Sequence, residues 1–192
     1  MIKNIRKIRI IGGNLRSRKI TFTTTFPTLR PTSNRIRETL FNWLSVVELN
    51  FKNAHCLDCY AGTGALSIEA LSRHAASATL LELNKSVVTQ IQNNLLILGI
   101  KNGHVIHSNT LKWLSTYKKK FNLIFIDPPF NSQLINSTIL LLEENSWLME
   151  PSWIYIETHV KNCNLKIPSN WHFYRSGIAG QAYYCLYKRH CK

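Results

Sequence analysis

Acidic residues are scarce in this chain, and aspartate is almost absent from it. The 192 residues include 24 Lys and Arg against 10 Asp and Glu, which gives a net charge of +14. Only two of the acids are aspartates, Asp58 and Asp127. Residues 1–37 hold ten Lys and Arg and no acid. The excess of positive charge is therefore concentrated at the start of the chain, which argues against an evenly basic protein.

Features that define several other classes of protein are also missing. No stretch approaches the roughly 18 consecutive apolar residues that a membrane-spanning helix needs, and the first residues do not resemble a signal peptide. The five cysteines have no framework spacing, which favours reduced thiols in a cytoplasmic protein. Cys56 and Cys59 form one CxxC without a second pair, so we expect packing thiols rather than zinc or redox chemistry. The seven histidines form no ligand pattern, and no metal site is expected.

Strand and helix patterns alternate from about residue 54. Apolar positions at three- and four-residue steps, followed by Gly99, predict a helix over residues 85–98. The repeated units predict an α/β, Rossmann-like fold with a mostly parallel, doubly wound sheet. The expected strands of this sheet lie at residues 55–59, 78–82, 104–107, 121–127 and 153–158.

The two ends of the chain depart from this alternation. Two strand patterns at residues 171–176 and 183–189 are joined by too few residues for a helical crossover, so we expect an antiparallel pair. At the other end, residues 1–50 predict a small hairpin with a bend at Gly12 and Gly13, then a helix that begins near residues 32–34. We therefore expect a basic extension, residues 1–50, attached to a catalytic domain of residues 51–192.

A glycine loop follows the first strand of the main domain, where α/β folds bind ligands. Gly62 and Gly64 allow the backbone to approach a ligand closely. Asp58 precedes the loop, and Glu82 ends the next strand, where a carboxylate can accept hydrogen bonds from a ribose diol. Asp58 would repel a pyrophosphate but suits an ammonium group, and Ser67 replaces the third glycine of a dinucleotide motif. These features favour S-adenosyl-L-methionine over a nicotinamide dinucleotide; the alternative is a tight turn without a ligand.

The segment Asp127-Pro128-Pro129-Phe130 follows the fourth expected strand. Prolines have no N–H, so the Asp127 carboxylate and nearby carbonyls remain available as hydrogen-bond acceptors. Two acceptors on an exocyclic amino group favour a pyramidal nitrogen whose lone pair can attack a methyl donor. Phe130 provides a ring on which an extruded base can stack. A strand-ending turn is the simpler alternative, but the glycine loop is expected at the same edge of the sheet.

Together these segments resemble the bacterial small-subunit (16S) ribosomal RNA guanine-N2 methyltransferases of the RsmD type. The resemblance covers nearly the whole chain, through motifs at residues 10–13, 35–44, 57–66, 69–73, 127–130 and 179–181. It implies an S-adenosylmethionine-dependent methyltransferase that modifies 16S ribosomal RNA, within an assembled or partly assembled small subunit. We expect a cytoplasmic monomer without a metal or a membrane anchor.

The resemblance also implies roles for individual residues. Asp58, Tyr60, Gly62 and Gly64 would shape the S-adenosylmethionine pocket, Glu82 would hold its ribose, and Asn109 would contact its adenine. Asp127, with Pro128 and Pro129, would orient the guanine amino group, and Phe130 would stack on the base. The chain departs from the family at two positions: Ser17 replaces a usual glycine, and Asn34 replaces a usual aspartate.

The basic residues of the extension predict a surface that holds the RNA backbone. The residues assigned to it are Arg16, Arg18, Lys19, Arg30, Arg35 and Arg37. A generally basic composition is the alternative. Two other functions also stay open: adenine-N6 methylation of DNA or RNA, which the same catalytic residues would support, and a non-catalytic RNA-binding role in ribosome assembly.

Overall fold

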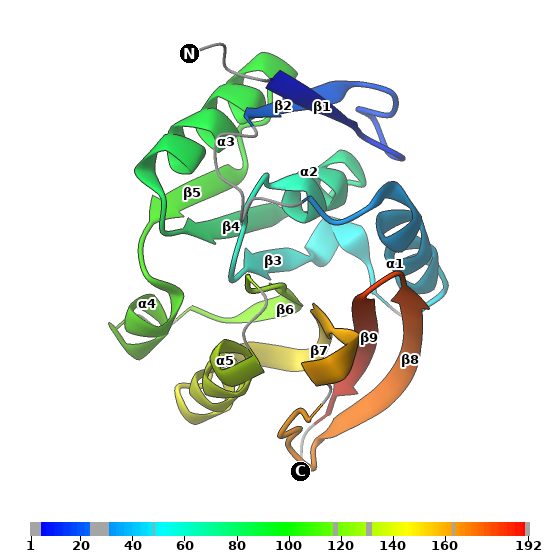
Figure 1. Ribbon diagram of the computed structural model, residues 1–192, viewed down its shortest axis with the longest axis vertical. Coiled ribbons are helices and arrows are strands. Elements are labelled where there is room, and N and C mark those ends of the chain that lie inside the picture. Colours follow the sequence, from blue (N-terminus) through cyan, green and yellow to red (C-terminus); the bar gives the residue numbers. More distant parts are fainter. Residues whose placement is uncertain are drawn as a thin grey trace.

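A seven-stranded sheet in the order β5-β4-β3-β6-β7-β9-β8 forms the centre of the computed structural model (Figure 1). The structure describes residues 5–23, 31–47, 49–116, 119–129, 132–162 and 164–190. Strands β3 to β7 run parallel, whereas β9 is antiparallel to both of its neighbours, β7 and β8. The strands are β3 (His55–Asp58), β4 (Ser77–Glu82), β5 (Gly103–His107), β6 (Phe121–Ile126), β7 (Leu148–His159), β8 (Trp171–Ala179) and β9 (Ala182–Arg189). The predicted parallel sheet and its antiparallel end are both confirmed.

The order of the strands reverses at β3. The chain winds outward from β3 through β4 to β5, then returns to place β6 on the other side of β3. Loops that leave the carboxyl ends of β3 and β6 therefore diverge, and such a switch point is where open α/β sheets bind ligands.

Helices cover both faces of the sheet. One core cluster joins the sheet to α1 (Asn34–Val46), α2 (Ala65–Ser72) and α3 (Lys85–Leu98), and the other joins it to α4 (Thr110–Thr116) and α5 (Ser132–Glu144). The predicted bounds of α3 are confirmed, because its signals are local: the Asn84 side chain caps its first turn and Gly99 ends it in a left-handed conformation. Two short 3-10 turns occupy Phe51–Asn53 and Val160–Asn162.

The basic extension packs against the main domain. Strands β1 (Ile5–Arg9) and β2 (Lys19–Thr23) form the predicted antiparallel hairpin, which lies beside α2 and α3 (Figure 1). Asn94 of α3 fixes β2, since its side chain accepts a hydrogen bond from the Thr21 N–H and donates one to the Thr21 carbonyl. Helix α1, which Ser33 caps, buries Leu40, Phe41 and Leu44 in the core cluster that also contains the hairpin and the sheet. The two predicted units therefore share one core.

Two further observations bear on the classes considered above. Cys56 and Cys59 are buried, and burial raises the pKa of both thiols. Both features suit residues that pack in the core. Within the described residues, no helix is both long and apolar enough to cross a membrane, and no three metal-ligating side chains come together.

Candidate functional site

A cavity of about 770 Å³ opens at the carboxyl ends of β3, β4, β6 and β7. The glycine loop and the Asp-Pro-Pro segment both line it, because parallel strands bring their carboxyl ends to one edge of the sheet. Its volume lies within the range of small-molecule sites. The predicted site residues that line it are Asp58, Tyr60, Gly62, Glu82, Asn109, Asp127, Pro128 and Pro129.

Asp58 ends β3 as a carboxylate that is only 2% exposed. The Ser67 hydroxyl of α2 donates a hydrogen bond of 2.8 Å to its Oδ2, which gives the serine at the third motif position a structural reason. Burial raises the pKa of Asp58 to about 7, and among the described residues no cation forms an ion pair with it. A buried carboxylate without a cation, beside a cavity, suits a positively charged ligand group.

Glu82 fixes the shape of the loop. Its Oε2 accepts a hydrogen bond of 3.0 Å from the Gly62 N–H, and its Oε1 accepts one of 2.8 Å from the Asn84 N–H. Each carboxylate oxygen has a second acceptor site. The side chain is therefore held in one orientation at the cavity wall while it keeps capacity for hydroxyl donors.

Gly64, the second glycine of the loop, makes the turn into α2. It does not line the cavity; it is the left-handed residue (φ 75°) at which α2 begins. A Cβ there would lie 3.1 Å from the Ile91 side chain and 3.4 Å from that of Leu80. Its lack of a side chain therefore serves the turn and the packing of α2, and Gly62 is the loop glycine on the cavity wall.

Tyr60 and Asn109 both line the cavity with part of their hydrogen-bonding capacity already used. The Tyr60 hydroxyl is 2.7 Å from the Thr138 hydroxyl of α5, which holds the phenol in place. The Asn109 side-chain carbonyl accepts a hydrogen bond from the Lys112 N–H in the first turn of α4. The Asn109 amide N–H groups are the part of that side chain suited to a ligand acceptor.

Asp127 directly follows β6 and faces the same cavity. The hydroxyl of Thr32, from the segment that precedes α1, donates a hydrogen bond of 3.2 Å to its Oδ2. Burial raises the pKa of Asp127 well above its usual range, with smaller contributions from the negative charges of Glu157 and Asp58. Pro128 and Pro129 follow it on the cavity wall, and Phe130 lies outside the described residues.

Glu157 is a cavity residue that the sequence reasoning missed. Ile126 pairs with Ile156 in the parallel register of β6 and β7, so the next residues, Asp127 and Glu157, are neighbours across the strands. The Tyr155 hydroxyl donates a hydrogen bond of 2.7 Å to Glu157 Oε2, and burial raises the pKa of Glu157. A single acid after the apolar run at residues 153–156 is the sequence signal that could have revealed it.

Four of the predicted RNA-contacting residues are exposed: Arg16, Arg18, Lys19 and Arg35. Arg18 donates a hydrogen bond to the Ile97 carbonyl of α3, and Arg30 lies outside the described residues. A shallower depression is lined by Arg6, Lys7, Arg9 and Lys19, and it shares residues 31–33 with the main cavity. The basic depression and the main cavity are thus adjacent at residues 31–33.

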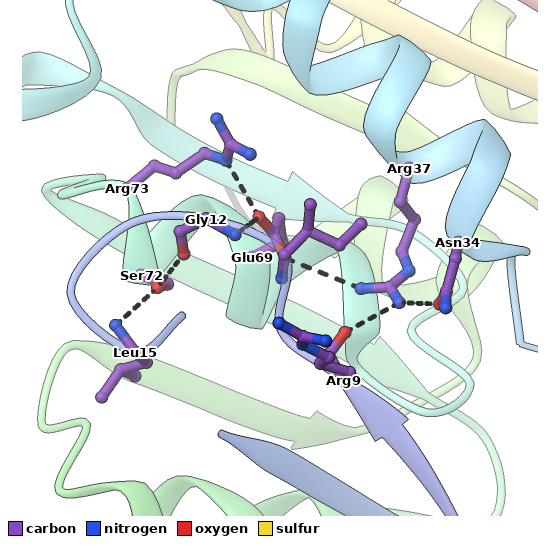
Figure 2. Close-up of polar contacts among 9 residues, drawn as sticks. Arg9, Gly12, Leu15, Asn34, Arg37, Glu69, Ser72 and Arg73 are labelled. Carbon is purple, nitrogen blue, oxygen red and sulfur yellow. Dashed lines mark hydrogen bonds and ion pairs between the residues drawn. The ribbon is translucent and has the colours of Figure 1, made fainter. Parts of the chain in front are cut away.

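Arg37 corrects the prediction of an RNA contact at that position. It is 1% exposed, and its guanidinium donates to the Arg9 carbonyl and to the Asn34 side chain (Figure 2). Its Nη1 lies 3.6 Å from Oε2 of Glu69, an acid of α2 that is fully buried. Arg37 lies on the face of α1 that packs against the core, two residues after the exposed Arg35. No part of its side chain is therefore available to RNA.

Glu69 is the centre of this arrangement, which we call the Glu69 cluster: Glu69, Arg37, Arg73 and the N–H groups of Ile11 and Gly12. Figure 2 shows Glu69 between the two arginines. Arg73 Nε lies 3.0 Å from Glu69 Oε1. The Ile11 and Gly12 N–H groups each donate to the carboxylate at 2.8 Å. Next to it, the Ser72 side chain links Gly12 and Leu15 of the bend. The cluster fixes the bend of the hairpin to α1 and α2.

Comparisons with known proteins agree with this geometry. A family model described as "Conserved hypothetical protein 95" matches residues 8–188. The chain is 47% identical over 183 residues to "Ribosomal RNA small subunit methyltransferase D" of Escherichia coli K12, covering 95% of this chain and 90% of that protein. It is 48% identical over 182 residues to the protein of the same name from Buchnera aphidicola subsp. Acyrthosiphon pisum, covering 94% and 93%.

Solved structures show the same fold. "Putative methyltransferase yhhF" from Escherichia coli superposes with a TM-score of 0.86 at 44% identity, covering 97% of this chain and all of that one. An RNA methyltransferase from Salinibacter ruber, in complex with S-adenosyl-L-homocysteine, has a TM-score of 0.64 at 12% identity, covering 85% and 95%. The predicted Rossmann-like methyltransferase fold is thereby confirmed.

Proposed function

The chain belongs to the family described as conserved hypothetical protein 95, with relatives named small-subunit ribosomal RNA methyltransferase D, and on this premise we propose its reaction. It is a methyltransferase of ribosomal RNA that uses S-adenosyl-L-methionine. The finer proposal is that the acceptor is the N2 amino group of one guanine in 16S RNA of an assembled or partly assembled small subunit in the cytoplasm. The observation that carries it is the meeting of Asp58 and Asp127, the two aspartates, at one cavity.

The cavity residues fit S-adenosylmethionine, which when bound supplies a methyl group on a positively charged sulfur. The buried Asp58 carboxylate, without a cation among the described residues, suits the ammonium group of the ligand. Glu82, held by two backbone N–H groups, suits the ribose hydroxyls. The Asn109 amide suits an adenine acceptor. These three polar groups match the three polar parts of the ligand.

Asp127 suits the acceptor amine. Its carboxylate can accept a hydrogen bond from one N2–H, which favours a pyramidal nitrogen with its lone pair directed at the methyl group. As the N–C bond forms, the bond between the methyl carbon and sulfur breaks and its electron pair stays on sulfur, which becomes neutral. The nitrogen becomes positively charged and must lose a proton, and a carboxylate with a raised pKa can accept it. No residue needs to form a covalent bond, so catalysis rests on positioning and electrostatics.

The basic depression supports an RNA substrate. Lys19 lines this depression, and the exposed side chains of Arg16 and Arg35 lie outside its lining; all three can bind phosphates. Residues 31–33 line both the depression and the cavity. A base held in the cavity must leave its stack, as is usual for enzymes that modify bases. The hairpin and the start of α1 would thus hold the RNA backbone while the target guanine enters.

Nucleoside analysis of the product tests the proposal. The protein is incubated with S-adenosylmethionine and either bare 16S RNA or isolated unmethylated small subunits, and the methylated nucleosides are identified by mass spectrometry. We expect N2-methylguanosine at a single position, with a higher rate on the subunit. N6-methyladenosine would instead support the adenine alternative. Absence of both methyl transfer and cofactor binding by calorimetry would support a non-catalytic assembly factor.

A further inference from the structure

A second carboxylate stands beside Asp127 in the acceptor half of the cavity. The pairing of β6 with β7 ends at Ile126 and Ile156. The next residues, Asp127 after β6 and Glu157 within β7, are therefore separated by about one interstrand spacing, roughly 4.8 Å between backbones. Residues opposite each other in a sheet project from the same face, and both of these line the cavity. We call them the acidic pair.

Each member of the acidic pair is held by one neutral hydroxyl. Thr32 donates to Asp127, and Tyr155 donates to Glu157 Oε2. Among the described residues no cation forms an ion pair with either acid. Two adjacent carboxylates with only hydroxyl partners retain acceptor capacity toward the cavity, and a ligand with two neighbouring donors would satisfy it.

The hydrogen-bonding edges of the purines differ in this respect. Guanine presents N1–H and the N2 amino group side by side, which are two adjacent donors. Adenine presents its N6 amino group beside N1, which is an acceptor. Two neighbouring carboxylates match the first pattern and repel the second, because the N1 lone pair of adenine would face a negative oxygen.

We propose that Glu157 is a specificity-determining residue that accepts a hydrogen bond from guanine N1–H while Asp127 accepts one from the N2 amino group. This inference rests on the proposed function and explains why the same Asp-Pro-Pro turn would serve guanine here rather than adenine. Tyr155 is a positioning residue, because its hydroxyl holds one oxygen of Glu157 and turns the other toward the base. A site built to pair with N–H donors rejects an analogue that lacks one, since a buried charge would be left without a partner.

A base analogue separates this role from a general structural one. 2-Aminopurine keeps the reactive 2-amino group of guanine, but its N1 is an acceptor without a proton. Once the target guanine has been mapped, small subunits are reconstituted with guanosine or 2-aminopurine riboside at that position. We expect the wild-type protein to favour guanosine by about 10- to 100-fold in kcat/KM, as for one hydrogen bond to a charged group.

The informative variant is Glu157→Gln, because an amide can donate to N1 of 2-aminopurine as well as accept from N1–H of guanine. Its preference for guanosine should fall by about tenfold or more, with S-adenosylmethionine affinity unchanged. The matched control is Glu144→Gln, the same substitution at an exposed position of α5, which should keep the wild-type preference. An equal loss of kcat/KM on both bases, or an unchanged preference, would overturn the inference.

The wild-type protein provides a second measurement if Glu157→Gln does not fold. Protonated Glu157 can donate to N1 of 2-aminopurine, so the preference for guanosine should narrow as the pH falls. The titratable groups that face Glu157 are Asp127, which directly follows β6, Tyr155 of its own strand and Tyr184 opposite it on β9. Protonation of Asp127 should slow methylation of both bases to the same extent, because Asp127 contacts the 2-amino group that they share. A preference independent of pH would contradict the role of Glu157.

The two proposals fail in different ways. If the wild-type product is not N2-methylguanosine, both proposals fail, because the role of Glu157 requires a guanine acceptor. If the product is N2-methylguanosine and the preference over 2-aminopurine does not depend on Glu157 or on pH, only the present inference fails.

Discussion

The Glu69 cluster and the acidic pair are two groups of inward-facing ionisable residues with opposite charge balance. In the cluster, the Glu69 carboxylate lies near two arginines and accepts two backbone N–H groups. In the acidic pair, each carboxylate has one hydroxyl partner, and burial raises the pKa of both acids. The balanced group joins the hairpin to the helices, whereas the unbalanced group lies on the cavity wall. In this protein, uncompensated charge marks the place where a ligand is needed.

The largest effect is expected from removing the carboxylate of Asp127. Asp127→Ala should lower kcat/KM for methyl transfer by about 10³-fold, because the amine loses both the hydrogen-bond acceptor that orients it and the base that takes up its proton. Affinity for S-adenosylmethionine should stay within about threefold of wild type, as calorimetry would measure. Turnover near the wild-type rate would show that the acidic pair is not part of the chemistry.

The same position also separates function from stability. Because the folded-state pKa of Asp127 is raised, the folded protein binds its proton more tightly, and unfolding becomes easier as the pH rises above the unfolded value near 3.8. The neutral isostere Asp127→Asn removes this destabilising ionisation. Urea denaturation at pH 7 should therefore show an unfolding free energy that is not lower than that of wild type, and a clear loss would contradict the comparison.

The Glu69 cluster should respond in the opposite way. Glu69→Gln leaves the buried Arg37 without its balancing charge, which we expect to lower the unfolding free energy by about 3 kcal/mol. Burial already lowers the pKa of Arg37, and Glu69 is the largest of the charges that oppose this shift. The control Glu38→Gln, at an exposed position of α1, should change stability by less than about 0.5 kcal/mol. Equal effects in the two variants would remove the distinction between balanced and unbalanced acids.

Asp58 offers a test that depends on pH. Its pKa of about 7 in the free protein means that the carboxylate loses its charge below neutrality, so affinity for S-adenosylmethionine should fall by up to about tenfold per pH unit there. Above about pH 8 the α-amino group of the ligand loses its own proton, so affinity should peak between these values. Calorimetry from pH 5.5 to 9 measures the profile. Asp58→Asn should abolish the loss of S-adenosylmethionine affinity below neutral pH. An affinity of the wild-type protein that does not change with pH would argue against an ammonium group at Asp58.

The Glu69 cluster and the acidic pair also show how much of the structure and of the site could be predicted from the sequence. The meeting of Asp58 and Asp127 was predictable, because carboxyl ends of parallel strands share one edge of a sheet. The bounds of α3 were predictable because its cap and its final glycine are local. The burial of Arg37 was not, since its partner Glu69 is 32 residues away and nothing periodic links them. Glu157 escaped notice because its place beside Asp127 depends on the order of the strands, and spacing along the chain does not give that order.

The smallest effect is expected at Ser17, in the bend that the Glu69 cluster anchors. Ser17 has φ 71°, a left-handed conformation that costs a non-glycine residue about 1 kcal/mol. Its hydroxyl accepts an exposed hydrogen bond from Arg9, which offsets little of that cost. Since the cluster holds the bend in this shape whatever residue 17 is, Ser17→Gly should raise the unfolding free energy by about 0.5 kcal/mol. Ser137→Gly, inside α5, is the matched control and should lower it by a similar amount; a loss of stability in both variants would mean that Ser17 is not strained.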